Sequence, residues 1–275
     1  MSTFSIYNIK IIYLGLLITS LLGACNYGAD KTISFADNPV VAHRGAWKTD
    51  DLPPNSIAAL KKAIELRCTG SEFDVRMTAD DVLIVTHDPD YNEMGVEEST
   101  YAELSKVKLA NGEILPTLRE YILAGMNDND STGLVCEIKP SKHKDRNPVI
   151  AKKVLDLVEE LSAENYILSY ISFSYKVLET IEELQPTAVT QYLDGSKSPS
   201  QLQEDGIDGL DYYFTKFQSK PDWVSGAIEK GLILNAWTVN NIEDIDWVLT
   251  NGFNYITTDE PLLTFDRISD NSANK

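Results

Sequence analysis

The chain has 275 residues, of which 43% are hydrophobic, and it carries a formal net charge of −18 at pH 7. A chain this acidic lacks the basic face that a phosphate backbone requires, so we do not expect it to bind nucleic acid. Its length is enough for one large domain whose core needs no disulfide bonds for stability.

The first 38 residues are typical of an export signal followed by a tether. Residues 11–22 form an apolar run behind a single basic residue, Lys10, and this run is shorter than the about 20 residues that span a bilayer. It has the length of the hydrophobic region of a signal peptide. We therefore predict a signal peptide over residues 1–24 and a polar tether over residues 25–38.

The apolar run ends in Leu22-Gly23-Ala24-Cys25. This sequence resembles the lipobox of bacterial lipoproteins, which implies cleavage before Cys25 and lipidation of its thiol. We expect an exported protein that a lipid anchor holds to a membrane, on the periplasmic or cell-surface side. An ordinary secretory signal that is cleaved nearby is the alternative.

Strands and helices alternate along the rest of the chain, judged from apolar periodicity, caps and Gly or Pro breakers. The predicted strands are 39–42, 71–77, 133–138, 166–169, 188–192, 209–212, 232–237 and 255–258, and the run 82–86 extends the second of them. The predicted helices are 56–66, 101–107, 118–126, 148–161, 173–184, 199–203, 221–230 and 242–250, followed by a closing helical turn.

This alternation predicts parallel βαβ units. Removing residues 1–24 from the 275 leaves 251, with a net charge of −19 because Lys10 is the one charged residue lost. Eight strands in a domain of this length favour a closed (β/α)₈ (TIM) barrel over an open doubly wound sheet. We place the barrel domain at residues 39–267, with a small insertion after the second strand, and a C-terminal tail at residues 268–275.

Side chains suited to catalysis occur at the carboxyl ends of the predicted strands. In a barrel these ends form one mouth, where catalytic groups lie. Glu72 and Asp74 also face the same side because they are two residues apart on a strand. The side chains placed at the mouth are His43, Glu72, Asp74, Glu137, Lys139, Trp237 and Asp259.

Three carboxylates, those of Glu72, Asp74 and Glu137, are expected to meet at this mouth. At about 4 Å and an effective dielectric constant near 20, each like-charged pair costs about 4 kcal/mol. Either a cation neutralises the acids or some of them are protonated. Hard oxygen ligands favour Mg²⁺ or Ca²⁺. The alternative, which the residues leave equally open, is that each acid pairs with a neighbouring Arg76 or Lys139.

Two of the three histidines, His43 and His87, end strand-like runs on either side of the acidic pair. Because imidazole titrates near neutral pH, we predict that they act as a general acid–base pair. The third, His143, lies in a polar loop and is expected to be solvated. Arg44 and Lys139 are the cations placed to neutralise a phosphoryl oxygen.

Other chemistries have little support in this sequence. It contains no Gly-x-Ser-x-Gly elbow and no His-Glu-x-x-His motif, which disfavours serine-nucleophile and zinc chemistry. Cys68 and Cys136 are expected to be buried free thiols. Four aromatic residues at strand ends either line a pocket or pack in the barrel: Tyr192, Tyr212, Tyr213 and Trp237.

Short motifs occur in a fixed order over about residues 39–265. They are His43-Arg44-Gly45, Pro53-Pro54-Asn55-Ser56, Glu72-x-Asp74-Val75, Thr78-x-Asp80, His87-Asp88, Leu115-Pro116-Thr117-Leu118, Glu137-x-Lys139, Trp237-Thr238-Val239-Asn240 and Thr258-Asp259-x-Pro261. Each motif is weak by itself, but the ordered set resembles the glycerophosphodiester phosphodiesterase family.

The resemblance implies metal-dependent hydrolysis of glycerophosphodiesters to an alcohol and glycerol 3-phosphate in a (β/α)₈ barrel. It implies one Mg²⁺ or Ca²⁺ ion held by Glu72, Asp74 and Glu137, with His43 and His87 as acid and base. A free hydroxyl of the glycerol attacks phosphorus, and water then opens a cyclic phosphate. Arg44, Lys139 and Trp237 are implied to bind the substrate.

Two alternatives to this function stay open. Pro54 stands where the family usually has a glutamate, so the preferred alcohol is less well specified than the reaction. One alternative is a phospholipase-D-like action on another phosphodiester. The other is a catalytically silent barrel that binds a ligand at the cell surface, which the full set of acids and histidines disfavours.

Overall fold

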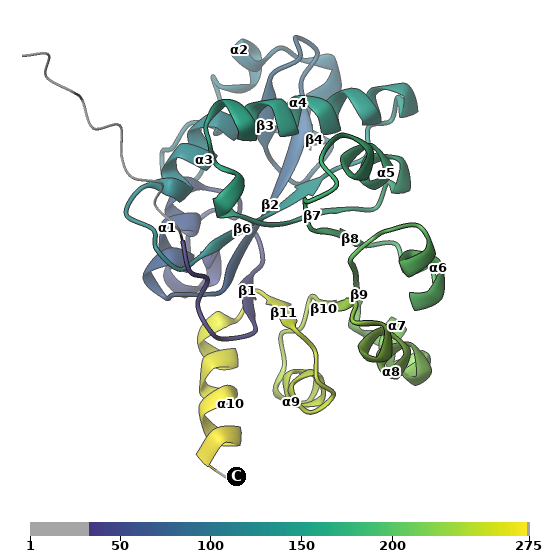
Figure 1. Ribbon diagram of the computed structural model, residues 1–275. Helices are drawn as coiled ribbons and strands as arrows, with labels where there is room; N and C mark the ends of the chain where they lie inside the picture. Colours follow the sequence, from purple (N-terminus) through teal and green to yellow (C-terminus); the bar gives the residue numbers. More distant parts are fainter. Residues whose placement is uncertain (1–32, 274–275) are drawn as a thin grey trace, which may run out of the picture. The chain divides into compact units, whose positions relative to one another are not determined.

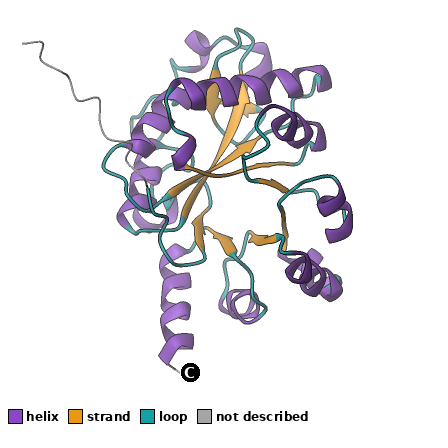
Figure 2. Ribbon diagram, in the orientation of Figure 1, coloured by secondary structure: helices purple, strands orange, loops and turns teal. Residues whose placement is uncertain are grey.

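The structure is a computed structural model that describes residues 33–273, so the predicted signal peptide and Cys25 lie outside the described part. Eight parallel strands close into a barrel, since β1 pairs with both β2 and β11. This confirms the predicted fold (Figures 1 and 2). The barrel strands are β1 (Val40–Ala42), β2 (Gly70–Met77), β6 (Gly133–Ile138), β7 (Ile167–Ser172), β8 (Thr190–Tyr192), β9 (Gly209–Tyr213), β10 (Ile233–Trp237) and β11 (Tyr255–Thr258).

Helices surround the strands, as Figure 2 shows. Amphipathic sequences with clear caps explain where they begin: Ser56 accepts a hydrogen bond from the Ala59 amide, and Thr117 forms a capping box with Glu120. The helices are α1 (Ile57–Glu65), α2 (Tyr101–Leu104), α3 (Leu118–Met126), α4 (Asn147–Glu160), α5 (Tyr175–Leu184), α6 (Pro199–Glu204), α7 (Phe214–Ser219), α8 (Pro221–Lys230), α9 (Ile242–Thr250) and α10 (Pro261–Ala273). The sequence patterns did not predict α7.

A small insertion follows the second barrel strand, as predicted. The strand β3 (Leu83–Val85) pairs antiparallel with the end of β2, so the run 82–86 extends the sheet without entering the barrel. A hairpin of β4 (Asp90–Tyr91) and β5 (Met94–Gly95) and the short helix α2 complete the insertion. Helix α2 ends at Leu104, so it is shorter than the helix predicted over residues 101–107.

The alternation of side chains along each strand decides what faces the barrel interior. On β2, Phe73 and Val75 point outward and belong to the core beneath the helices, which directs Glu72 and Asp74 inward. Asp74 pairs directly with Glu137 in the register of β2 and β6. The strand pairing thus brings the predicted acids together at one end of the barrel.

Both ends of the described chain depart from the predicted domain boundaries. We predicted residues 33–38 as the last part of a polar tether, but the Phe35 side chain packs against the cluster inside the barrel that contains Val41, Val135 and Leu168. Gly133 makes room for it, because a Cβ atom there would lie 2.9 Å from the Phe35 ring. The folded domain therefore includes residues from 33 onward.

The predicted C-terminal tail, residues 268–275, is also partly wrong. Helix α10 continues to Ala273, and Ile268 packs with Phe265 against the cluster that contains Val40 and Cys68. An apolar face on the helix explains why it does not end at the predicted boundary.

Cys68 and Cys136 are free and buried, as predicted. Burial raises the pKa of the Cys68 thiol to about 12 and that of Cys136 well above its usual value, which makes both thiols unreactive. Within residues 33–273, the longest apolar helices fall short of what a membrane crossing needs.

Candidate active site

The three predicted acids converge at the carboxyl end of the barrel. Carboxylate oxygens of Glu72, Asp74 and Glu137 all lie within 4.8 Å of one another, and all three side chains are buried. They come from adjacent strands, β2 and β6. The prediction that these acids meet at one mouth agrees with this geometry.

Two basic side chains offset part of this negative charge. Lys139 Nζ lies 2.8 Å from Glu137 Oε1 and 3.2 Å from Asp74 Oδ1. Arg44 Nε lies 3.6 Å from Asp74 Oδ2. The other basic residue near the acids in sequence, Arg76, donates from Nε to the backbone carbonyl of His87 instead.

Of the three acids, Glu72 is the one whose negative charge is least offset by neighbouring groups. The backbone N–H of Arg44 donates to its Oε2 at 2.8 Å, while its Oε1 has no hydrogen-bond partner among residues 33–273. The next residue, Gly45, lets this turn pass close to helix α1: it has φ +78°, and a Cβ there would lie 2.6 Å from the Ala59 backbone. Arg44 itself is left-handed, with φ 55°.

Burial sets the acid–base state of this cluster. It raises the pKa of Glu72 well above its usual value and that of Glu137 to about 8, and the charge of Asp74 adds to both effects. Burial also opposes ionisation of Asp74, but Lys139, His87 and Asn55 together lower its pKa to about 2. Two of the acids therefore resist ionisation unless more positive charge arrives.

The cluster fits a divalent cation. Three buried acids face two bases, and one carboxylate oxygen of Glu72 is left without a partner in the described chain. Oxygen donors in this number suit a hard ion such as Mg²⁺ or Ca²⁺. The alternative, in which the acids pair with basic side chains, accounts for Asp74 and Glu137 but not for Glu72.

His43 is held by a carboxylate that follows the last barrel strand. Its Nδ1 lies 2.8 Å from Asp259 Oδ1, which also accepts a hydrogen bond from Trp47 Nε1, and Asn240 donates to Oδ2 at 2.7 Å. Burial opposes ionisation of Asp259, but its bond with His43 lowers its pKa to about 2. An ionised, fixed carboxylate orients the imidazole and leaves Nε2 for a substrate.

His87 faces the same space from the insertion side. Its Nδ1 lies 2.8 Å from Asp88 Oδ1, and 38% of its side chain is exposed, against 19% for His43. Burial lowers the pKa of His87, and the positive charge of Lys139 acts in the same direction, whereas the charge of Asp74 opposes both. His87 is therefore neutral at pH 7.

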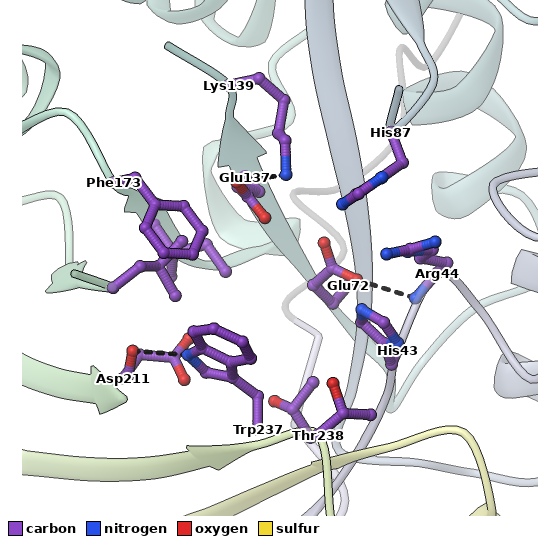
Figure 3. A pocket seen from close by; sticks show the side chains of 13 residues that line it. His43, Arg44, Glu72, His87, Glu137, Lys139, Phe173, Asp211, Trp237 and Thr238 are labelled. Atoms are coloured by element: carbon purple, nitrogen blue, oxygen red, sulfur yellow. Dashed lines mark hydrogen bonds and ion pairs between the residues drawn. The ribbon is translucent and has the colours of Figure 1, made fainter. Parts of the chain in front are cut away.

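These groups line one cavity of about 120 Å³ (Figure 3). His43, Arg44, His87 and Lys139 surround it, and Trp237 forms its opposite wall. The predicted histidines and substrate-binding residues therefore meet at this cavity. His143, in contrast, is exposed in a loop, as predicted.

The aromatic residues divide between the cavity and the core. Trp237 lines the cavity, and Tyr213 packs against it with ring centroids 5.4 Å apart. Tyr192 and Tyr212 are buried in the core cluster on the outer side of the barrel. Phe173, which the sequence analysis did not single out, also lines the cavity and contacts Trp237 edge-on at 5.6 Å.

Sequence reasoning also did not assign Asn55, which lies in the motif Pro53-Pro54-Asn55-Ser56, to the site. Ser56 caps helix α1, whereas Asn55 Nδ2 donates to Asp74 Oδ2 at 2.7 Å. Its Oδ1 accepts the Asp74 backbone N–H in return. The left-handed backbone at Asn55, φ 63°, is a conformation that asparagine adopts more readily than most other non-glycine residues.

Comparisons with known proteins agree with this geometry. Residues 43–263 match the model of the glycerophosphoryl diester phosphodiesterase family. A glycerophosphodiester phosphodiesterase of Caldanaerobacter subterraneus subsp. tengcongensis is 30% identical over 239 residues, covering 81% of this chain and 94% of the relative.

Solved structures give the same result. A glycerophosphodiester phosphodiesterase from Parabacteroides distasonis superposes with a TM-score of 0.82 at 36% identity, covering 87% of this chain and all of that one. An Oleispira antarctica phosphodiesterase, solved in complex with the product sn-glycerol-3-phosphate, shares the fold at 21% identity and a TM-score of 0.73, covering 84% of this chain and 97% of that one. The chain belongs to the glycerophosphoryl diester phosphodiesterase family.

Proposed function

We propose that the protein is a phosphoric diester hydrolase that cleaves glycerophosphodiesters into an alcohol and glycerol 3-phosphate. One observation carries this proposal: an acidic cluster, two histidines and two basic side chains meet at the same cavity of a barrel of this family. A barrel that only binds a ligand, without catalysis, does not need all of these side chains.

The two histidines have different surroundings, which suggests different roles. Asp259 fixes the His43 imidazole through Nδ1 and leaves Nε2 for the substrate, so His43 suits the general acid that protonates the departing alcohol. His87 is kept neutral by burial, so it suits the base that removes a proton from the attacking hydroxyl of the glycerol arm. Attack forms one P–O bond and breaks the P–O bond to the alcohol, and water then opens the cyclic phosphate.

Glu72, Asp74 and Glu137 are the residues that would hold one divalent cation, Mg²⁺ or Ca²⁺. Such a cation supplies Lewis-acid polarisation of a phosphoryl oxygen. Arg44 and Lys139 add donors to the phosphate from the chain itself, and Lys139 also holds Asp74 and Glu137 in place. Trp237 supplies an apolar wall.

The products distinguish this function from its alternatives. With glycerophosphocholine and an added divalent cation, we expect equal amounts of choline and glycerol 3-phosphate, read by coupled enzymatic assays. Release of phosphocholine and glycerol instead contradicts the proposed bond cleavage. Choline released from lysophosphatidylcholine but not from glycerophosphocholine favours the phospholipase-D-like alternative. Saturable binding without any product favours the silent barrel.

We also propose that the protein is an exported lipoprotein, since Leu22-Gly23-Ala24-Cys25 resembles a lipobox. The Cys25→Ser variant of the full chain is expected to leave the membrane fraction, because the thioether that carries the lipid cannot form. Fractionation of cells followed by immunoblotting measures this. Cys68→Ser is the matched control, because that thiol is buried in the barrel domain. Unchanged membrane retention of Cys25→Ser contradicts the anchor.

A further inference from the structure

Asp211 is a buried acid in the cavity that the mechanism above does not use. It lies on β9, faces the barrel interior and is 1% exposed. Its Oδ1 has no hydrogen-bond partner within the described residues, although the side chain lines the cavity. A buried carboxyl oxygen without a partner carries a desolvation cost, so such groups call for an explanation.

A structural role does not account for this side chain. No Lys or Arg of residues 33–273 forms an ion pair with Asp211, and the charge that acts on its pKa is that of another acid, Glu137. Burial raises the pKa of Asp211 well above its usual value, and Asn235 opposes this through a hydrogen bond. The contact with Trp237 uses the backbone: Trp237 Nε1 donates to the Asp211 carbonyl oxygen at 2.8 Å.

The position of Asp211 defines a second end of the cavity. Figure 3 shows Asp211 and Trp237 on the side opposite His87 and Arg44. A phosphoryl group held between Arg44, Lys139 and the histidines therefore extends one substituent towards β9. The cavity lining also includes the apolar side chains of Ile171 and Leu193, and Asp211 is the acidic group at the β9 end.

We propose that Asp211 binds a hydroxyl of the substrate's glycerol arm and so selects glycerol over arms that lack this hydroxyl. The inference rests on the proposed function and identifies the residue that recognises one half of the substrate. The glycerol arm is common to all glycerophosphodiesters, so it suits a closed subsite of fixed shape.

A hydroxyl fits this subsite better than an ammonium group of the alcohol. Burying a charge costs far more than burying a hydroxyl. A hydroxyl can donate to or accept from a carboxyl group in either protonation state. Phe173, one of the aromatic rings that line the cavity, already faces a cation, because Lys139 Nζ lies 5.8 Å from its centroid.

The test compares glycerophosphocholine with 2-hydroxypropyl phosphocholine, which keeps the attacking hydroxyl and lacks the terminal one. We expect the wild-type protein to prefer glycerophosphocholine in kcat/KM by about 10- to 100-fold, the value of one hydrogen bond to a charged or strongly polar partner. Asp211→Ala is expected to lose most of this preference by slowing the glycerol substrate alone. Asp211→Asn, which keeps the shape and a donor and acceptor, is expected to retain most of it.

Three results overturn the inference. Equal slowing of both substrates in Asp211→Ala, with unchanged melting temperature, assigns Asp211 a role in positioning the site. A preference that survives in Asp211→Ala places the recognition elsewhere. A loss confined to glycerophosphocholine and glycerophosphoethanolamine, with glycerophosphoglycerol unaffected, assigns Asp211 to a cationic alcohol.

Binding measurements separate this inference from the proposed function. Calorimetry with glycerol 3-phosphate and 2-hydroxypropyl phosphate reads the subsite without turnover. Tighter binding of glycerol 3-phosphate, lost in Asp211→Ala, supports the inference even if no phosphodiester is cleaved. Equal binding of the two phosphates by the wild-type protein overturns it even if glycerophosphocholine is cleaved.

Discussion

Turnover of glycerophosphocholine by His43→Ala is expected to fall about 10²- to 10⁴-fold, the usual contribution of a general acid or base. The same loss is expected for His87→Ala. In His43→Ala the cavity loses the imidazole that Asp259 orients, so the departing alcohol has no proton donor at that position. In His87→Ala the cavity loses the neutral imidazole that removes the proton from the attacking hydroxyl. Steady-state kinetics at saturating cation measures both variants.

His143→Ala provides the matched control, since it removes an exposed imidazole and is expected to keep wild-type turnover. Melting curves of all three variants check that the barrel is intact. Asp259→Asn is expected to slow turnover less than His43→Ala, because the imidazole stays but loses its ionised partner. Turnover within tenfold of wild type in both His43→Ala and His87→Ala contradicts the acid–base assignment.

Removal of divalent cations is expected to abolish activity, and Mg²⁺ or Ca²⁺ is expected to restore it. Without the added positive charge, both Glu72 and Glu137 resist ionisation, because burial raises the pKa of Glu72 well above its usual value and that of Glu137 to about 8. The measurement is turnover after exhaustive chelation, followed by titration with each cation. Full activity after chelation would falsify a metal-dependent mechanism.

The same acids give a readout that does not depend on turnover. The pKa of Glu137 is about 8 in the folded protein, against its usual 4.5. Between these values the folded state holds a proton that the unfolded state has lost, so the stability of the cation-free protein falls as pH rises. A bound cation competes with that proton, so we expect its stabilising effect on the melting temperature to grow from pH 5 to pH 8.

Glu137→Gln is the control for this pH dependence. It removes the titrating carboxyl group while keeping the shape, so the cation-free melting temperature is expected to change less across pH 5 to 8. Identical melting temperatures with and without cation at every pH contradict the site formed by Glu72, Asp74 and Glu137.

The sequence alone determined the fold class and the family, and it grouped the three acids and two histidines that meet at the cavity. Apolar periodicity marks eight strands separated by helices, and parallel strands with helical connections close into a barrel. The same rule gathers the carboxyl ends of strands at one mouth, which is why the sequence is enough to group Glu72, Asp74 and Glu137. Local information was sufficient because each of these residues is placed by its own strand.

Only the tertiary structure decided which groups touch. His43 and Asp259 are 216 positions apart, and their 2.8 Å contact depends on β1 and β11 closing the barrel. The hydrogen bond between Asn55 and Asp74 depends on the left-handed backbone at Asn55, which the sequence pattern before helix α1 does not reveal. Both contacts join segments whose relative position no local pattern encodes.

The ionisation states of the site residues and the boundaries of the domain were also decided by the tertiary structure. The pKa values of Glu137 and Asp74 diverge because burial and the position of Lys139 act on them differently. The unpartnered oxygen of Asp211 and the packing of Phe35 inside the barrel likewise follow from burial in the closed fold. A sequence states which groups are present, whereas distance and desolvation, which set their energies, exist only once the chain has folded.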